Sequence, residues 1–566
     1  MRSLALYALA NFEPATLAQY ADAVVVTLYD SDKEVRLYAL KALGMLEPFF
    51  FAQHADAVVL RLDDSDEEVR AAALDALITL DPATLARHTE SAVARLEDSD
   101  PAVRNAALEM LMKLNSATLA PHADAVVSRL DDVNDDVRMM ALRALGMLDP
   151  VPLSQHADAV AARLKDPRCK VRESASSTLS KLDPATLALH ADALVAMLED
   201  LLWPLRAVAL FTLSKLHPAT LARHADAVAA RLEDSGELAR RMALQALGQL
   251  DPATLARHAD AVVTRLEDSE AGVREAALYT LSKLDPATLS RHVCAVVAKL
   301  EDSKAGVREC ALGALSKMRA GMLAWYAADA VVMRLEDSEA SVREAAVFTL
   351  VKLNAAMFAP YATSVLARLE DSDAAVRISA IQTLGRLAPA TLSPHADVVV
   401  ASLEDSGAAV RRIALKALGR LDPATLAQHS DAVVARLDDS EAAVRKSALE
   451  TLAALEPTAL CHYAAALGMR AKDADEGVRE VALAMLRSLK GHVDLSETQS
   501  KLDPLELEEY SSAIIASLAD FDEDALTGDV DLESRDASSQ RLGDTDIGAG
   551  SVYEKQLIDL MFPRSF

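Results

Sequence analysis

The stretch LEDSEAGVREAAL at residues 266–278 recurs along the chain with few changes. Thirty-four residues later the chain reads LEDSKAGVRECAL, and other copies read LEDSDPAVRNAAL and LDDSEAAVRKSAL. The arginine of each copy recurs from Arg36 to Arg479 in steps of 34 residues, except for one step of 35 between Arg308 and Arg343. An aspartate stands six residues before each of these fourteen arginines. Such a period is typical of repeat proteins, in which each unit contacts only its neighbours.

Each unit of the repeat predicts two helices. In DPATLARHADAVVTRLED (251–268), Asp251 suits the N-cap and Pro252 suits the first helical position. The turn residues DSE then end this helix and begin a second one over 271–284, where apolar residues fall at helical spacing. No alternation typical of a strand occurs. The sequence therefore predicts an all-α chain of about fourteen helix pairs over residues 1–490.

The pattern Asp-x4-Val-Arg at the turn into the second helix resembles HEAT repeats, of the armadillo-type superfamily, over roughly residues 1–490. The tetratricopeptide signature and the TPLH motif of ankyrin repeats are missing. The resemblance implies a right-handed α-solenoid whose second helices line a concave face. It also implies a non-catalytic scaffold or adaptor that binds protein partners. In such repeats the Asp/Arg pair forms a hydrogen-bonded ladder between neighbouring turns, here assigned to Asp268, Arg274, Asp302 and Arg308.

Composition narrows the classes of partner and compartment. A net charge of −28 disfavours nucleic acid, which needs a basic footprint, and anionic membrane surfaces. No run reaches the 18 apolar residues of a membrane-spanning helix. The four cysteines form no CxxC motif, which favours a reducing intracellular compartment; we predict the cytoplasm, with the nucleus or an organelle left open.

Histidine or tyrosine recurs at one position of the predicted first helix, as at His258 and Tyr326. A row of metal ligands is one interpretation. The structural interpretation is favoured, because stacked helices lie about 8–10 Å apart while zinc needs ligand atoms at about 2 Å. An enzyme similar to deoxyhypusine hydroxylase or the bilin lyases is the alternative function. No His-Glu dipeptide, GxSxG, P-loop or HExxH motif is present, so we predict no catalytic residue, cofactor, metal or small-molecule substrate.

The position five residues after each repeated arginine is expected to point away from the core, and it varies more than its surroundings. One explanation is that an exposed position accumulates substitutions freely because nothing constrains it. A concave partner site is the other, because large apolar groups gather there in mid-array instead of polar ones. We assign that hypothetical site to Phe211, Tyr279 and Phe348 at this position, together with Leu201, Leu202 and Trp203, which replace the usual polar turn residues.

Both ends of the chain depart from the repeat. Residues 491–521 are predicted to form one more helix or cap, 522–551 an acidic disordered linker, and 552–566 either a short docking helix or a frayed end. Residues 490–566 hold 18 acidic and 6 basic residues. The first residues fit a second helix that lacks its first. We therefore expect a longer parent array, or fraying or dimerisation at this end.

Overall fold

The computed structural model describes residues 2–9 and 13–493. Within these ranges the chain forms α-helices, 3₁₀-helices and turns, with no strand. The predicted all-α class is therefore confirmed. No helix in the same ranges is long and apolar enough to cross a membrane. The predicted segments 522–551 and 552–566, and 491–521 beyond Val493, lie outside the described residues.

A unit in the middle of the array shows how the repeat folds. Its elements are α23 (Pro252–Ala256), α24 (Ala259–Thr264), the 3₁₀-helix η10 (Arg265–Glu267) and α25 (Ala271–Leu281). The side chain of Asp251 accepts hydrogen bonds from the N–H groups of Ala253 and Thr254 at 3.1 and 3.0 Å, so it caps α23. The helix α25 buries Val273, Ala277, Leu278 and Leu281.

The prediction of one continuous first helix over 251–268 is wrong. The N–H groups of Arg257 and His258 donate to the carbonyls three residues back, at 3.2 and 2.9 Å. This 3₁₀-type closure ends α23. His258 itself leaves the helical region, with φ −105° and ψ 2°. Each first helix is therefore a pair of short helices, and only the second is continuous.

The chain divides into two compact units, residues 1–387 and 388–566. In the first unit the long helices stack in chain order, each against the next. They are α4 (Lys33–Gly44), α7 (Glu67–Leu77), α10 (Pro101–Leu111), α13 (Asp135–Leu145), α16 (Cys169–Leu179), α19 (Trp203–Leu213), α22 (Glu237–Leu247), α25, α28 (Ala305–Leu315), α31 (Ala340–Leu350) and α34 (Ala374–Gly385). In the second unit, α37 (Ala408–Leu418), α40 (Ala442–Leu452) and α43 (Glu476–Val493) stack in the same way.

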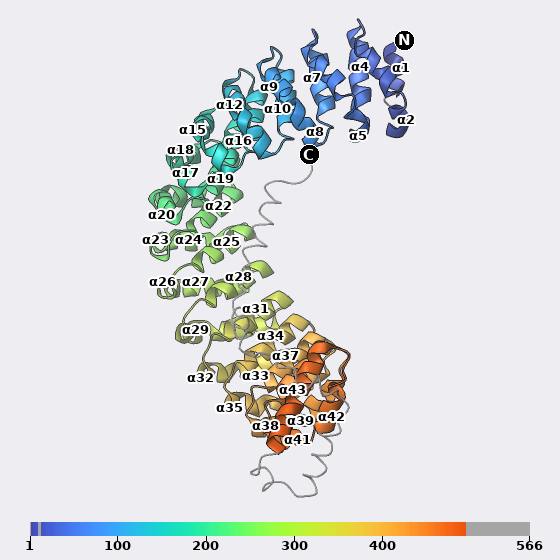
Figure 1. The fold of residues 1–566 in the computed structure, drawn as a ribbon. Coiled ribbons are helices and arrows are strands. Elements are labelled where there is room, and N and C mark those ends of the chain that lie inside the picture. Colours follow the sequence, from blue (N-terminus) through green and yellow to red (C-terminus); the bar gives the residue numbers. More distant parts are fainter. Residues whose placement is uncertain (1, 10–12, 494–566) are drawn as a thin grey trace. The chain divides into compact units, whose positions relative to one another are not determined.

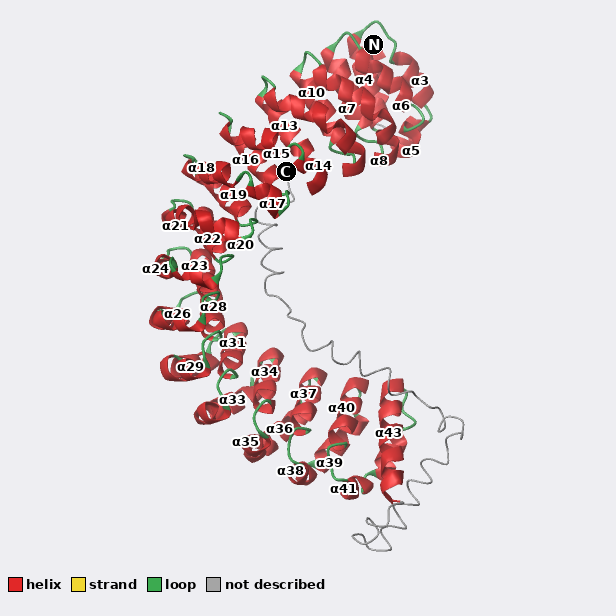
Figure 2. Cartoon of the chain, turned by 60° about the vertical axis from the view of Figure 1, so that its left-hand side comes forward, coloured by secondary structure: helices red, strands yellow, loops and turns green. Residues whose placement is uncertain are grey.

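The long and the short helices of the first unit form two rows. From α22 to α31 the long helices lie along the right-hand, inner side of the stack in Figure 1. The short helices α23, α24, α26 (Pro286–Arg291), α27 (Val293–Ala298) and α29 (Ala320–Tyr326) lie along the opposite side. Figure 2 shows the same arrangement from another direction. Surface residues of the long helices therefore share one continuous face.

Candidate partner-binding surface

The repeated arginines connect consecutive units. Nη1 of Arg274 donates to the backbone oxygen of Asp268, in its own unit, at 2.8 Å. Its Nε and Nη2 donate to the two carboxylate oxygens of Asp302, in the next unit, at 2.8 Å each. Arg308 repeats the arrangement with Asp302 O at 2.9 Å and the carboxylate of Asp337 at 2.8 and 2.5 Å. The structure thus links Asp268, Arg274, Asp302 and Arg308 into one chain, which we term the main ladder.

The carboxylates of the main ladder are held in their charged form. Burial pushes the pKa of Asp268 upward, but the hydrogen bond from Arg240 and the backbone N–H of Glu270 outweigh it and leave the pKa below its usual value. The same balance, with Arg274 and Lys304, lowers the pKa of Asp302. These aspartates therefore carry full charge at neutral pH although their side chains are nearly buried. Their role is to join units.

A second arginine ladder runs in the opposite sense, and sequence reasoning missed it. Nη1 of Arg265 donates to the backbone oxygen of Leu232, in the preceding unit, at 3.2 Å, and Nη2 pairs with Glu233 at 2.6 Å. Arg334 does the same with Leu300 and Glu301, at 3.0 and 2.8 Å. The signal was a second basic residue nine positions before most of the repeated arginines.

The histidine row does not converge on a metal site. Nε2 of His258 lies 3.7 Å from Oδ1 of Asp226 in the preceding unit, too long for a hydrogen bond. Burial lowers the pKa of His258 against the opposing effect of Asp226. Where tyrosine replaces histidine, the hydroxyl of Tyr361 donates to Asp329 at 3.0 Å. No three His, Cys, Asp or Glu side chains in the described part of the chain are placed to hold one metal ion. The row contacts the preceding unit instead.

Three of the predicted partner-binding residues share one face and one arrangement. Phe211 on α19, Tyr279 on α25 and Phe348 on α31 each lie four residues before a lysine. Tyr279 and Phe348 are about half exposed, at 49% and 51%, while Phe211 is half-buried. The long helices that carry them form the inner row of the first unit (Figure 1).

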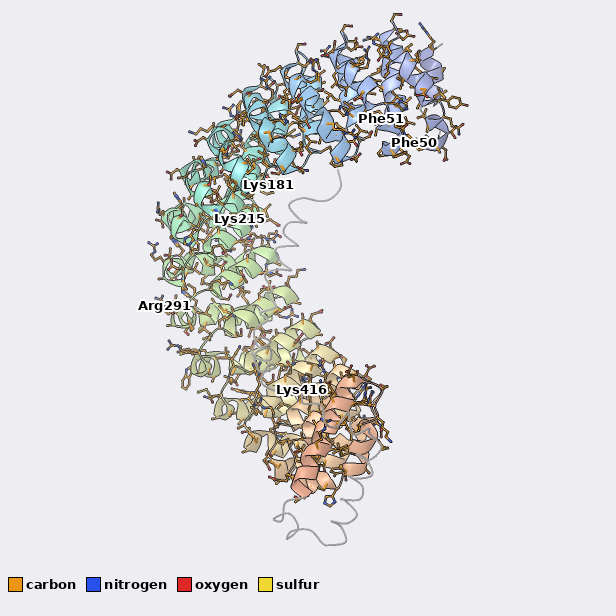
Figure 3. The ribbon with its side chains drawn as sticks, viewed as in Figure 1. Phe50, Phe51, Lys181, Lys215, Arg291 and Lys416 are labelled. Carbon is orange, nitrogen blue, oxygen red and sulfur yellow. The ribbon has the colours of Figure 1, made fainter. Side chains whose placement is uncertain are left out.

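The three lysines were not predicted. Lys215, Lys283 and Lys352 place Nζ 4.9, 4.5 and 4.8 Å from the centroids of the rings of Phe211, Tyr279 and Phe348. These distances fit cation–π contacts between residues one helical turn apart. Each lysine also stands just beyond the end of its helix, where the helix dipole favours positive charge. Figure 3 labels Lys215 and its counterpart Lys181 in the preceding unit. We use the name inner surface for the three aromatic–lysine pairs and the helices between them.

The helices between the aromatic pairs carry smaller or more polar groups at the same position. Gln245 occupies it on α22, and Gly313 occupies it on α28. A Cβ atom placed on Gly313 would meet nothing within 4 Å. Every second long helix therefore carries an aromatic ring. Adjacent packed helices lie about 8–10 Å apart, so the spacing between the rings is about 16–20 Å.

This geometry predicts that Gly313→Ala stabilises the protein. Gly313 is exposed in the middle of α28, and glycine there costs about 0.5–1 kcal/mol relative to alanine. We expect the free energy of unfolding to rise by about that amount in urea titrations. Gly236→Ala should instead destabilise, because its Cβ would lie 2.5 Å from the ring of Trp203. A loss of stability in Gly313→Ala would show that the space is filled.

The structure separates Trp203 from the other predicted aromatic residues. Trp203 is the first residue of α19, whereas Phe211 lies eight residues further on, which is about 12 Å along a helix axis. The ring of Trp203 lies against Gly236 in the next turn. Leu201, Leu202 and Trp203, at the turn into α19, are 96%, 46% and 42% exposed. The predicted site therefore divides into the inner surface and a separate cluster at the turns.

Comparisons with known proteins agree with the architecture. The family model of the adaptin N terminal region matches residues 226–458, and that of the HEAT repeat associated with sister chromatid cohesion matches residues 92–111. No curated protein sequence matches the chain. A crystal structure of importin beta is similar at 14% identity and a TM-score of 0.51, over 83% of this chain and 74% of that chain. A crystal structure of Kap121p is similar at 14% identity and a TM-score of 0.49, over 84% of this chain and 57% of that one.

Together, the period, the stacked helices, the family-model matches and the similarity to importin beta define an all-α repeat protein of the solenoid type. The chain is a HEAT-repeat α-solenoid, as the Asp-x4-Val-Arg pattern suggested.

Proposed function

We propose that the chain is a non-catalytic scaffold that binds proteins, and that its inner surface holds an acidic segment of a partner. The observation that carries this proposal is the set of three aromatic–lysine pairs on alternate helices. Aromatic groups at protein interfaces often dominate the binding energy. The lysines beside them provide positive charge in a chain whose net charge is −28.

Charge supports an acidic partner in particular. Along α16 to α31 the residues five and nine positions after the repeated arginine include no aspartate or glutamate. Lys317 on the α28 unit continues the row of exposed lysines between Lys283 and Lys352. A partner with carboxylates near apolar side chains complements both features. A reducing compartment remains our proposed location, consistent with the exposed thiols of Cys169 and Cys294.

The test starts from a partner captured with the full chain from its source cell and identified by mass spectrometry. Binding of that purified partner is then measured for the Lys215→Glu, Lys283→Glu, Lys352→Glu triple variant. We expect the affinity to fall at least about 100-fold, since each pair combines an aromatic anchor with a charge. The affinity of the unmodified chain should also weaken as salt is raised.

Two controls sharpen this experiment. Lys113→Glu changes a lysine at the same position of α10, where the neighbour one turn back is Glu109 rather than an aromatic residue, and it should leave affinity unchanged. A Phe211→Ser, Tyr279→Ser, Phe348→Ser variant should lose affinity like the charge variant. Unchanged affinity in both triple variants, with helicity retained, would rule out the inner surface.

A further inference from the structure

Three consecutive turns of the first unit depart from the repeat at the same position. Five residues before the repeated arginine, the chain has serine in ten units and alanine in one, but Val133, Pro167 and Leu201 in the other three. Val133 is 98% and Leu201 is 96% exposed. We call these residues, together with Leu202 and Trp203, the turn ridge. An apolar ridge at the water-exposed edge of an acidic protein is unfavourable unless another surface covers it.

The main ladder does not require these substitutions. Arg138 and Arg172 still pair with Asp166 and Asp200, at 2.8 and 2.7 Å, beneath the ridge. The turn of the α19 unit likewise keeps Arg206 at 2.5 Å from Asp234. The main ladder is therefore kept here as elsewhere, and the apolar residues of the ridge are an addition to it.

The ridge is preorganised by a matching change in the next unit. Gly236 replaces a larger residue at its turn position, and a Cβ there would lie 2.5–2.7 Å from three ring atoms of Trp203. The missing side chain leaves room for the indole to pack against Gly236, and Trp203 stays 42% exposed. A ring held in this way loses little conformational entropy when a partner covers it.

Positive charge accompanies the ridge. Lys165 stands seven residues before the repeated arginine, a position where eleven of the fourteen units have aspartate or glutamate. Arg168 and Lys170 follow it in the same turn, and all three residues are exposed. Arg168 reaches Asp135 at 3.1 Å, whereas Lys165 and Lys170 make no ion pair with the described residues. The turn around Pro167, in the middle of the turn ridge, is therefore positively charged, whereas most other units have an acidic residue at the position of Lys165.

The chain contains a segment with the complementary chemistry. Residues 494–566 hold 18 acidic and 5 basic residues, and apolar pairs such as Ile514–Ile515 and Leu557–Ile558 are spaced among the acids. These 73 residues can span up to about 250 Å when extended. We infer that the turn ridge is the docking site of the chain's own C-terminal segment, residues 494–566, from the same or from another copy. Carboxylates of the segment meet Lys165, Arg168 and Lys170, and its apolar side chains cover Leu201 and Trp203.

Tryptophan fluorescence of the full chain tests this inference directly, because the only two tryptophans are Trp203 and Trp325. In a Trp325→Phe background, Trp203 is the sole emitter. Replacing the acids of residues 522–533 by their amides should release the segment. We expect acrylamide quenching of Trp203 to increase about twofold and its emission to shift to longer wavelength, as exposure of a covered ring requires. Lys165→Glu, Arg168→Glu, Lys170→Glu in the same background should have the same effect.

The matched control is the Trp203→Phe chain, in which Trp325 emits. Trp325 is 83% exposed on α29, and its quenching should not respond to either set of changes. Protection of Trp203 that is independent of protein concentration assigns the segment to the same copy, and protection lost on dilution assigns it to another copy; both support the inference. Unchanged quenching of Trp203 in both variants overturns it. So does a blue shift with phosphatidylserine vesicles alone, which would make the ridge a membrane contact.

Discussion

Replacing Arg274 by alanine is expected to lower the free energy of unfolding by about 3 kcal/mol. The change removes four hydrogen bonds and leaves the carboxylate of Asp302, whose side chain is 8% exposed, without its guanidinium. Hydrogen bonds to charged groups are worth about 1.5–3 kcal/mol, and an unpaired buried charge adds to the loss. Asp268→Ala should cost on the order of 1–3 kcal/mol, because the carboxylate that binds Arg240 is lost.

Urea unfolding followed by circular dichroism measures the loss, and hydrogen exchange locates it. Faster exchange should concentrate on α25 and α28, while α40 keeps its protection, because a solenoid transmits contacts only between neighbours. Arg291→Ala is the matched control: this exposed arginine at the end of α26 (Figure 3) should change stability by less than about 0.5 kcal/mol. If Arg274→Ala and Arg291→Ala lower the free energy of unfolding by equal amounts, the main ladder has no structural role.

The sequence predicted what the period alone determines. A residue pair repeated in fourteen units, such as Asp268 and Arg274, has to serve a contact that every unit makes. The structure shows which atoms meet. The arginine joins the backbone of its own aspartate to the carboxylate of the next one. The spacing of six residues within a unit reveals the first contact, and only the stacking of units reveals the second.

The break in the first helix could not be predicted from spacing. Leu255, Ala259 and Val262 follow helical periodicity across the break at His258. Periodicity reports which residues are buried, and the two short helices bury the same ones. The choice of a three-residue closure over a four-residue one depends on backbone hydrogen bonds that leave no mark in the pattern.

The sequence predicted only part of the candidate site, because the pattern reports which face a residue lies on and not where it lies along the helix. A helical wheel placed Phe211, Tyr279 and Phe348 on one face, and the long helices do share that face. Trp203 was added to this group because large apolar residues gather in the same units, which takes no account of distance along the helix axis, and it lies at the other end of α19. The lysines four residues later were visible in the sequence as aromatic–x3–Lys. Their significance appears only when each ammonium is seen over its ring.

Acid should unfold the array through the main ladder, and the Asp268→Asn variant isolates the contribution of one unit. Because the folded pKa of Asp268 is lowered, the unfolded chain binds this proton more readily, and the stabilisation is complete only above the unfolded pKa of 3.8. The stabilisation is lost as the pH falls through the folded pKa. The amide keeps the shape without the charge. We expect it to cost about 2 kcal/mol at pH 7, within the range for charged hydrogen bonds.

The difference between Asp268→Asn and the unmodified chain should therefore shrink as the pH falls below about 4 toward the lowered folded pKa of Asp268, because the protonated carboxyl group, like the amide, carries no charge. Glu275 has the opposite tendency, because burial raises its pKa, so its own contribution to stability grows as the pH falls. Since Glu275 is present in both chains, subtraction removes it. Urea unfolding of the two chains at matched salt between pH 7 and pH 3 gives the difference at each pH. A difference that stays constant across this range would mean that Asp268 stabilises the fold only through its shape and backbone contacts. The charge of its carboxylate would then add nothing to stability.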